Sequence, residues 1–313
     1  MDNSFACTNA GDAYKEPSLV SIGVPVRNGE AYLTEALELL LNQTYKNIEV
    51  IVSDNNSSDG TARIIEDFAA LDDRIRVFRH KETLSAFDNF QFVLEQSKGQ
   101  FFMWAACDDR RSLNYIETLI LPLIENPEAG LAFGQVGVTA DLTRGMKVTP
   151  VQFDCESKKT DNSLSIIYKY GVINCYHIYG VIRKKMMNDY KWTDIDNGPD
   201  RALLLHLALK GDVVQVSGTQ LIYFSPEMEK TLEEQAVANN LRALRPFPEV
   251  RLALECAITV YRVNKTVLKP LAFLISFLLI YWGRHWRWIK PWLFEHTPSI
   301  VVNLYRRFKH DRA

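Results

Sequence analysis

Apolar runs alternate along the first half of the chain with segments whose apolar positions recur every three or four residues. A continuous apolar run predicts a buried strand, and recurrence at three or four residues predicts a helix. Strands are therefore predicted over residues 19–26, 48–52, 75–78 and 101–106, with helices over 32–41, from 61 onward, over 87–96 and over 115–124. Alternation this regular predicts an α/β fold with a Rossmann-like, mostly parallel sheet flanked by helices.

The pattern becomes less regular beyond residue 130. Strands are predicted over 131–138, 178–183 and 220–224, with a short helix near 166–170 and an apolar helix over 203–209. The segment 139–162 is polar and irregular, which predicts a long loop. We expect this loop to cover the site and to choose the acceptor.

A long predicted helix over 233–263 and an apolar run over 271–282 dominate the end of the chain. A membrane-spanning helix needs about 20 apolar residues, so this run is better suited to lying in the membrane interface than to crossing the bilayer. The tryptophans that follow, interleaved with arginine and lysine, fit the headgroup zone. The alternative is that these helices pack on the rest of the protein or build an oligomer.

The formal net charge of −2 gives no basic excess of the kind that nucleic-acid binding requires. The charge is unevenly distributed, because basic residues from 265 onward outnumber the two acidic ones, Glu295 and Asp311. The basic residues of this tail are Lys265, Lys269, Arg284, Arg287, Lys290, Arg306, Arg307, Lys309 and Arg312. The end of the chain is therefore a basic, apolar region.

The cysteines and the first residues indicate a reducing compartment. Five cysteines are scattered along 313 residues without any CxxC spacing, which indicates free thiols rather than a disulfide framework or a zinc site. Residues 1–16 are polar and lack the apolar core of a signal peptide. We therefore expect the protein to remain in the cytoplasm.

Two of the predicted strands lead into acidic residues. The strand over 48–52 is followed by Asp54, and the strand over 101–106 is followed by Cys107, Asp108 and Asp109. In an open α/β sheet, ligands bind beyond the carboxyl ends of the strands. Carboxylates delivered there predict a site for a divalent cation and a nucleotide.

Four motifs in this order resemble family 2 glycosyltransferases of the GT-A fold. They are Val24-Pro25-Val26-Arg27-Asn28-Gly29, Leu41-Asn42-Gln43-Thr44-Tyr45, Asp54-Asn55-Asn56-Ser57-Ser58-Asp59-Gly60-Thr61 and Cys107-Asp108-Asp109. The resemblance covers about residues 19 to 225. It implies a GT-A domain over 17–230, and the region 231–313 beyond it is expected from its own sequence to be helical and membrane-associating. It also implies an inverting transfer of one sugar from a nucleotide diphosphate to an acceptor hydroxyl, assisted by Mn²⁺ or Mg²⁺.

The resemblance assigns roles to the matched residues. Pro25 and Val26 should line the base subsite through backbone groups, and Asp54 should accept a hydrogen bond from the base, as in relatives that use uridine donors. Asp108 matches the position that holds the ribose, and Asp109 matches the position that ligates the cation. A hard cation takes oxygen ligands, so one or two carboxylates and the diphosphate suffice.

Inversion needs a general base, and Asn197-Gly198-Pro199-Asp200 before an apolar helix resembles the family's base segment. We assign the base to Asp200. The alternative is that Asp200 only caps its helix, and Asp194 and Asp196 are nearby competitors. Asp59 is expected to cap the second helix.

Several other polar residues are expected to lie outside the chemistry. Cys107 stands where many relatives have another acid, and we expect it to be a small buried side chain. His206 is expected to be packed within its helix, while Asp88 and Asn89 are expected to face solvent. The segment 225–230 lacks the Arg and His with which many relatives close over the diphosphate.

The resemblance also implies partners and a location. Bacterial members of the family often extend lipid-linked glycans or lipopolysaccharide, so we expect a glycan or lipid-linked acceptor and a peripheral position on the inner face of the plasma membrane. A catalytically impaired scaffold protein and a nucleotidyltransferase remain as alternatives. A processive synthase is disfavoured, because it would need several membrane spans.

Overall fold

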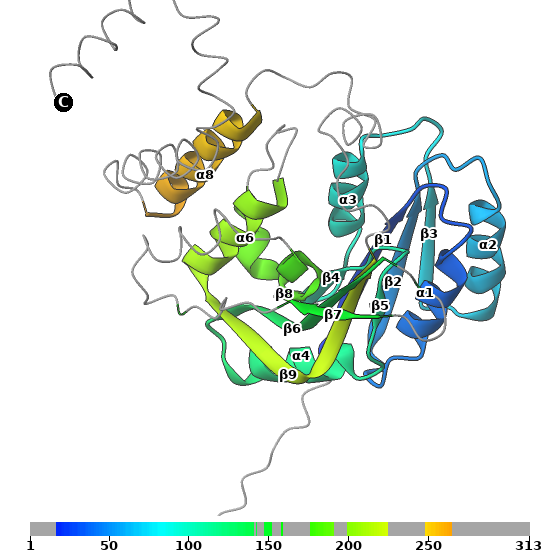
Figure 1. Ribbon diagram of the computed structural model, residues 1–313, viewed down its shortest axis with the longest axis horizontal. Coiled ribbons are helices and arrows are strands. Elements are labelled where there is room, and N and C mark those ends of the chain that lie inside the picture. Colours follow the sequence, from blue (N-terminus) through cyan, green and yellow to red (C-terminus); the bar gives the residue numbers. More distant parts are fainter. Residues whose placement is uncertain are drawn as a thin grey trace, which may run out of the picture.

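The protein was analysed as a computed structural model, which describes residues 17–140, 142, 147–151, 158, 176–190, 199–224 and 248–264. Its strands form one nine-stranded sheet in the order β3-β2-β1-β4-β8-β6-β9-β5, with β7 beside β6 (Figure 1). The strands are β1 (Val20–Val26), β2 (Ile48–Asp54), β3 (Ile75–Arg79), β4 (Phe101–Trp104), β5 (Arg110–Arg111), β6 (Ala129–Thr139), β7 (Thr149–Val151), β8 (Val181–Arg183) and β9 (Asp212–Phe224). The helices are α1 (Leu33–Leu41), α2 (Thr61–Leu71), α3 (Ala86–Glu95), α4 (Tyr115–Glu125), α6 (Pro199–Lys210) and α8 (Pro248–Asn264), with the short 3-10 turns η1 (Tyr176–Tyr179) and η2 (Lys184–Met187).

The half of the sheet formed by β3, β2, β1 and β4 is parallel throughout. All seven positions of β1 and all seven of β2 are buried. Parallel strands covered on both faces have no solvent side, so their sequences are continuous apolar runs rather than alternating ones. The α/β prediction for this half is confirmed, and helices connect its strands.

The other half of the sheet corrects the prediction of a mostly parallel sheet. Strand β8 runs antiparallel to both β4 and β6, and β5 runs antiparallel to β9, whereas β6 and β9 are parallel. The sheet as a whole is therefore mixed. The predicted strand over 178–183 is wrong in its first half, where η1 stands, and β9 begins eight residues before the predicted start at 220.

The helices cover the sheet on two faces, each with its own apolar core. On one face α1, α2 and α4 pack against β1, β2 and β6, with Leu37 and Ile116 among the residues that expose nothing. On the other face α3 and α6 pack against β2, β4 and β6, and α8 lies on the outer side of α6 (Figure 1).

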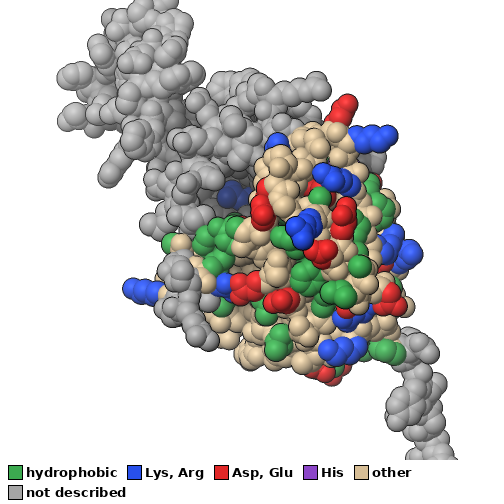
Figure 2. Space-filling model, turned by 90° about the vertical axis from the view of Figure 1, so that its right-hand side faces the viewer, with side chains coloured by type: hydrophobic (Ala, Val, Ile, Leu, Met, Phe, Trp, Pro, Cys, Tyr) green, Lys and Arg blue, Asp and Glu red, His purple; other side chains and the backbone are tan. Residues whose placement is uncertain are grey.

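Helix α8 falls within the long helix predicted over 233–263, and it contributes Cys256, Ala257 and Val260 to the core shared with α6. Within the described parts of the chain, no helix is long and apolar enough to cross a membrane. The predicted short helix near 166–170, most of the loop 139–162 and the apolar run 271–282 lie outside the described residues. On the face drawn in Figure 2, acidic and basic side chains are interspersed.

Candidate active site

The carboxyl ends of β2, β1 and β4 bring the predicted donor residues together. Strands β2 and β4 flank β1 in the sheet, so Asp54 at the end of β2 and the segment after β4 lie on either side of the Pro25–Val26 end of β1. Val26 and Asp54 are register partners. We refer to this row, with Asp108 and Asp109, as the acidic edge.

Asp54 is held firmly at the acidic edge and still has an unused oxygen. Its side chain is 1% exposed, and its Oδ1 accepts the Ser57 N–H at 2.9 Å, which closes the turn after β2. Its Oδ2 lies 3.3 Å from Nε of Arg79 but accepts no hydrogen bond from the described residues. No role was predicted for Arg79. Asp54 thus combines a fixed position with spare acceptor capacity, as a base-binding carboxylate requires.

Val26 shares in fixing the next residues of the edge. Val26 is 2% exposed, and its carbonyl oxygen accepts the Asn55 N–H at 2.8 Å. The Asn55 carboxamide in turn accepts the Leu84 N–H at 2.8 Å and donates to the Leu84 carbonyl at 3.1 Å. This pair of bonds ties the connection between β3 and α3 to the end of β2.

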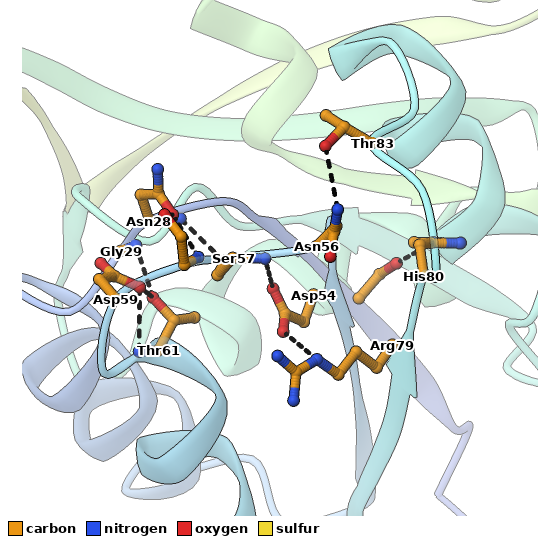
Figure 3. Close-up of polar contacts among 12 residues, drawn as sticks. Asn28, Gly29, Asp54, Asn56, Ser57, Asp59, Thr61, Arg79, His80 and Thr83 are labelled. Atoms are coloured by element: carbon orange, nitrogen blue, oxygen red, sulfur yellow. Dashed lines mark hydrogen bonds and ion pairs between the residues drawn. The ribbon is translucent and has the colours of Figure 1, made fainter.

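Two loops of the acidic edge are joined by hydrogen bonds that we call the loop lace (Figure 3). Asn28, in a left-handed conformation with φ of 52°, accepts the Ser58 N–H at 3.0 Å through its side chain, and the Gly29 N–H donates to Thr61 Oγ1 at 2.8 Å. The other bonds run from the Asn28 N–H to Ser57 Oγ (2.9 Å), from the Glu30 N–H to Asp59 Oδ2 (3.1 Å) and from the Gly60 N–H to Glu30 Oε2 (2.9 Å). Much of the first and third motifs therefore builds this scaffold.

Asp59 lies at the start of α2 as predicted, but Gly60 holds the N-cap position, and the Asp59 carboxylate binds the first residue of the helix from one position earlier. Asp59 Oδ1 accepts both the N–H of Thr61, the first residue of α2, at 3.1 Å and its hydroxyl at 2.5 Å. These hydrogen bonds, together with that from the Glu30 N–H, lower the pKa of the Asp59 carboxyl against the opposing effect of burial. Asp59 therefore orders the loop beside the acidic edge.

A buried polar cluster behind Asp54 was missed by the sequence analysis. Ser53 Oγ donates to Asn89 Oδ1 at 2.6 Å and lies 2.9 Å from His80 Nε2, and Asn89 Nδ2 donates to the Ser53 carbonyl at 3.2 Å. Asn89 is 2% exposed, so the expectation that it faces solvent is wrong. Its signal in the sequence is weak, because one polar residue on an amphipathic helix is normally solvated.

Asp108 and Asp109 differ in their surroundings. Asp108 is partly buried, and burial raises its pKa although its own backbone N–H and Arg111 oppose the shift. Asp109 is almost fully buried, with Oδ1 accepting the Phe224 N–H at 3.3 Å. Burial raises the pKa of Asp109 to about 7, Arg111 opposes the shift, and Asp108 adds to it. A positive charge brought to this pair would favour the ionised form of both acids.

Arg111 is the other residue of the acidic edge that the sequence did not reveal. It lies on β5, its side chain is 2% exposed, and its Nη2 is 3.7 Å from Asp109 Oδ2. Neither Nε nor Nη2 of Arg111, nor Oδ2 of Asp109, has a hydrogen-bond partner among the described residues. The ring of Phe224, whose N–H binds Asp109, lies 5.3 Å from that of Tyr32 in the loop after β1. Strand β9 is thereby tied to the acidic edge.

Asp200 lies in the first turn of α6, which begins four residues before the predicted start at 203. It is partly buried, and its Oδ1 accepts the Arg201 N–H at 2.9 Å, a contact of the kind that the capping alternative predicts. The competitors Asp194 and Asp196 and the segment 225–230 lie outside the described residues. His206, further along α6, is packed as predicted: it is 3% exposed, with Nε2 3.0 Å from the Met186 carbonyl.

Cys107 is partly buried rather than fully buried, and it packs against the apolar core on the α1 side of the sheet. Burial raises its pKa to about 12, with further contributions from Asp108 and Asp109, so the thiol stays protonated at neutral pH. A Cβ on Gly29 would lie 3.2 Å from its sulfur and 2.6 Å from Val26 Cγ2, so the loop passes close to both side chains. Cys107 is therefore a packing residue of the acidic edge.

Comparison with protein families gives a match to the model described as "Glycosyl transferase family 2" over residues 21–191, more than half of the 313 residues. The chain belongs to glycosyl transferase family 2. The matched range contains the loop lace, Asp54, Asp108 and Asp109, and it stops before Asp200. The family resemblance is thus confirmed for the part of the chain that contains the acidic edge.

Two bacterial glycosyltransferases match part of the chain. The chain is 36% identical over 101 residues to the glycosyltransferase GlyG of Streptococcus pneumoniae, which is 32% of this chain and 34% of GlyG. It is 32% identical over 108 residues to an uncharacterized glycosyltransferase of Haemophilus influenzae, which is 34% of this chain and 33% of that protein. The aligned parts span about a third of the length of these relatives.

Solved structures match over most of the chain. S. aureus TarS matches with a TM-score of 0.62 at 18% identity, over 86% of this chain and 44% of TarS. The fragment TarS 1-349 in complex with UDP-GlcNAc matches with a TM-score of 0.61 at 17% identity, over 90% of this chain and 76% of the fragment. At this identity the likeness establishes the shared fold, and the GT-A-like prediction is confirmed at that level.

The acidic edge of this family 2 chain has ligands suited to a hard cation, although too few to hold one alone. Asp108 and Asp109 offer carboxylate oxygens, and Asp109 Oδ2 is buried without a hydrogen-bond partner among the described residues. No group of three or more possible ligands of the His, Cys, Asp or Glu type occurs in the described part of the chain. Mn²⁺ or Mg²⁺ would complete its shell with waters and diphosphate oxygens, as hard cations commonly do.

Proposed function

We propose that this chain is an inverting, metal-dependent glycosyltransferase that moves one sugar from a UDP-sugar to a hydroxyl of a glycan or lipid-linked acceptor. The observation that carries the proposal is the convergence of acids from β2 and from the end of β4 on both sides of β1, in a chain of glycosyl transferase family 2. That arrangement offers a base-binding acid and phosphate-side acids at one sheet edge.

The base end of the donor is assigned to Asp54, Pro25 and Val26. Oδ2 of Asp54, which accepts no hydrogen bond from the described residues, suits an N–H of the base, and Val26 stands beside Asp54 in the same row of the sheet. Uridine is favoured because it presents such an N–H and because the TarS fragment of the same fold was solved with UDP-GlcNAc.

The phosphate end of the donor is assigned to Asp108 and Asp109, with Asp108 at the ribose and Asp109 at the cation. When bound, Mn²⁺ or Mg²⁺ would stabilise the negative charge that develops on the departing diphosphate. The Phe224 N–H and Arg111 hold the Asp109 carboxyl in a fixed orientation before any donor arrives. Such preorganisation spares the cost of ordering the acid during the reaction.

Asp200 is assigned as the general base. Its carboxylate would take the proton of the acceptor hydroxyl while the hydroxyl oxygen bonds to the anomeric carbon and the bond from that carbon to the diphosphate breaks. Attack from the face opposite the leaving group inverts the anomeric centre. Its position at the start of α6 leaves the carboxylate partly exposed, as a base that meets a second substrate requires.

The acceptor and the location are proposed from the sequence alone. An acceptor of surface polysaccharide or lipopolysaccharide biosynthesis fits the bacterial relatives, and the region 231–313 would bring the enzyme to it at the inner face of the plasma membrane. Its basic and aromatic residues favour anionic lipid headgroups.

The first test is thermal stabilisation of the purified protein by UDP, GDP, CDP and dTDP, each with and without Mn²⁺. We expect stabilisation by UDP that increases with Mn²⁺ and is lost in Asp108→Asn and Asp109→Asn. A ligand that binds only the folded state stabilises it by RT ln(1 + [L]/Kd), where [L] is the free ligand concentration. At equal concentrations, the nucleotide with the lowest Kd therefore gives the largest increase in Tm. Absence of stabilisation by all four nucleotides would favour the catalytically impaired scaffold.

A second test separates the base from the donor site. Asp200→Asn should keep UDP binding while hydrolysis of a UDP-sugar or transfer to acceptor falls by about 10²-fold or more. The matched control is Asp189→Asn, which changes a carboxylate paired with Lys210 at the other end of α6. Equal activity of the two variants would refute the assignment of Asp200.

A further inference from the structure

Arg79 stands beside Asp54 in a way that the assigned donor residues do not explain. The two residues are register partners at the carboxyl ends of the neighbouring strands β3 and β2, and Val26 continues the same row on β1. Register partners on parallel strands project to the same face of the sheet. Arg79 therefore belongs to the same surface as the base-binding acid (Figure 3).

The contact between Arg79 and Asp54 is an ion pair with unused hydrogen-bonding capacity on both sides. Arg79 Nε lies 3.3 Å from Asp54 Oδ2, yet that oxygen accepts no hydrogen bond from the described residues. A guanidinium has five N–H donors in a planar fork, and no described residue hydrogen-bonds to those on Nη1 and Nη2 of Arg79. The Arg79 side chain is 53% exposed, whereas that of Asp54 is 1% exposed. Of the two partners, the arginine is the one that can move.

A purely structural role would predict a different geometry. Arg76, three residues earlier on the same strand, donates through Nη1 to Glu49 Oε2 at 2.8 Å and to the Gln96 carbonyl at 2.8 Å. Its side chain is 27% exposed. Strand β3 thus carries one arginine whose bonds are made within the protein and one, at the ligand end, whose bonds are largely unmade.

We infer that Arg79 is a second base-reading residue, which donates a hydrogen bond to a carbonyl oxygen of uracil while Asp54 accepts the neighbouring N3–H. This inference rests on the proposed function of the acidic edge as a UDP-sugar site. In the free protein Arg79 neutralises the charge of Asp54. When the donor binds, the guanidinium of Arg79 turns toward the base. Uracil matches the pair because its N3–H lies between two carbonyl groups.

The chemistry makes the pair selective. The carboxylate accepts only and the guanidinium donates only, so together they require a base edge with an N–H next to a C=O. At the position where uracil offers the 4-carbonyl, cytosine offers an amino group, which faces the guanidinium donor to donor. A buried or half-buried donor left without an acceptor weakens binding, so the wrong base is penalised by Arg79 rather than merely ignored.

The test compares Arg79→Met with the matched control Arg76→Met in the full chain. Dissociation constants would be measured by calorimetry for UDP, for CDP, and for 2-thio-UDP and 4-thio-UDP, in which one carbonyl oxygen becomes a weakly accepting sulfur. We expect Arg79→Met to bind UDP about tenfold more weakly than wild type, and Arg79→Lys to recover part of that loss. Arg76→Met should lower Tm without changing the ratio of UDP to CDP affinity.

The thio analogues distinguish base reading from a structural effect. Wild type should bind one of them several-fold more weakly than UDP, whereas Arg79→Met should bind that analogue and UDP alike. Equal binding of UDP and both analogues by wild type, or an unchanged UDP affinity in Arg79→Met, would overturn the role of Arg79 alone. Equal affinity for CDP and UDP would overturn the uracil assignment. No UDP binding by wild type would overturn the donor proposal and this inference together.

Discussion

Asp54 and Asp109 are both buried carboxylates of the acidic edge that face an arginine, and the two pairs are built differently. Arg79 is half-exposed and can leave Asp54, whereas Arg111 is as buried as Asp109 itself. In an open pair such as Arg79–Asp54, where the arginine is half-exposed, the carboxylate can exchange the arginine for a ligand at little cost in free energy. A closed pair cannot, because separating it leaves a charge buried without compensation. The same two residue types therefore serve recognition at one end of the edge and fixed orientation at the other.

The largest effect that would test this contrast is expected from Arg111→Met. Measured at pH 9, well above the pKa of about 7 of Asp109, so that the carboxyl is ionised in the wild type, the substitution removes its buried counter-charge, and we expect it to lower the free energy of unfolding by about 3–5 kcal/mol. Urea denaturation measures the change. Arg111→Met combined with Asp109→Asn removes both charges, so the double variant should recover much of the loss. A loss below about 1 kcal/mol in the single variant would show that the pair is not closed in solution.

A smaller effect is expected from pH, because the pKa of Asp109 is raised to about 7 from an ordinary value of about 3.9. Below pH 4 the carboxyl is protonated in both states. As pH rises further the unfolded state ionises first, so Asp109 lowers the free energy of unfolding until pH passes 7. Between pH 5 and pH 8 this loss amounts to about 2–3 kcal/mol.

The variant Asp109→Asn has no titrating carboxyl at this position, so it is the control for the wild-type pH profile. With chelator present and without nucleotide, the variant should lose about 2–3 kcal/mol less than wild type between pH 5 and pH 8 in urea denaturation. Other carboxyls, such as Asp72 beside Arg74, have lowered pKa values and act in the opposite direction, but they are common to both proteins. Parallel pH profiles for the two proteins would contradict the raised pKa.

At the Asp54 end of the acidic edge, the loops are held in place by the hydrogen bonds of the loop lace rather than by the ion pair between Asp54 and Arg79. Asp59→Ala removes three acceptor contacts, from the Thr61 N–H, the Thr61 hydroxyl and the Glu30 N–H. The loss should be about 1–2 kcal/mol, as for other residues that cap a helix start. Asp67→Ala is the control on the same helix, since its exposed pair with Arg63 at 3.9 Å should contribute almost nothing. Equal effects would show that the lace is not formed.

The same contrast explains what could be predicted from the sequence. Strands β1 and β2 are buried on both faces, so their apolar runs gave their positions to within two residues. Strand β9 is partly exposed along most of its length and β5 has only two residues, so neither has a clear apolar run. The antiparallel part of the sheet follows from pairings between distant segments that no local pattern records.

The acids of the site were predictable and their arginines were not. A carboxylate at the end of an apolar run stands out, because strand ends in α/β sheets face ligands. Arg111 follows two acids and Arg79 ends a strand, and either would ordinarily be a solvated side chain. A signal for Arg79 did exist: once the first three strands are placed side by side, its position at the end of the third lies next to Asp54.

The smallest effect on stability is expected from Arg79→Met, and it completes the comparison. The guanidinium is 53% exposed and makes no hydrogen bond to Asp54, so solvent screens the pair and its loss should lower the free energy of unfolding by only about 0–1 kcal/mol. Urea denaturation of Arg79→Met and Arg111→Met under one set of conditions checks this. If the two variants lost equal stability, Arg79 would be locked to Asp54 as Arg111 is to Asp109, and the exchange of Arg79 from carboxylate to base would have no basis. A small loss of stability together with weakened UDP binding is the combination that only an open pair produces.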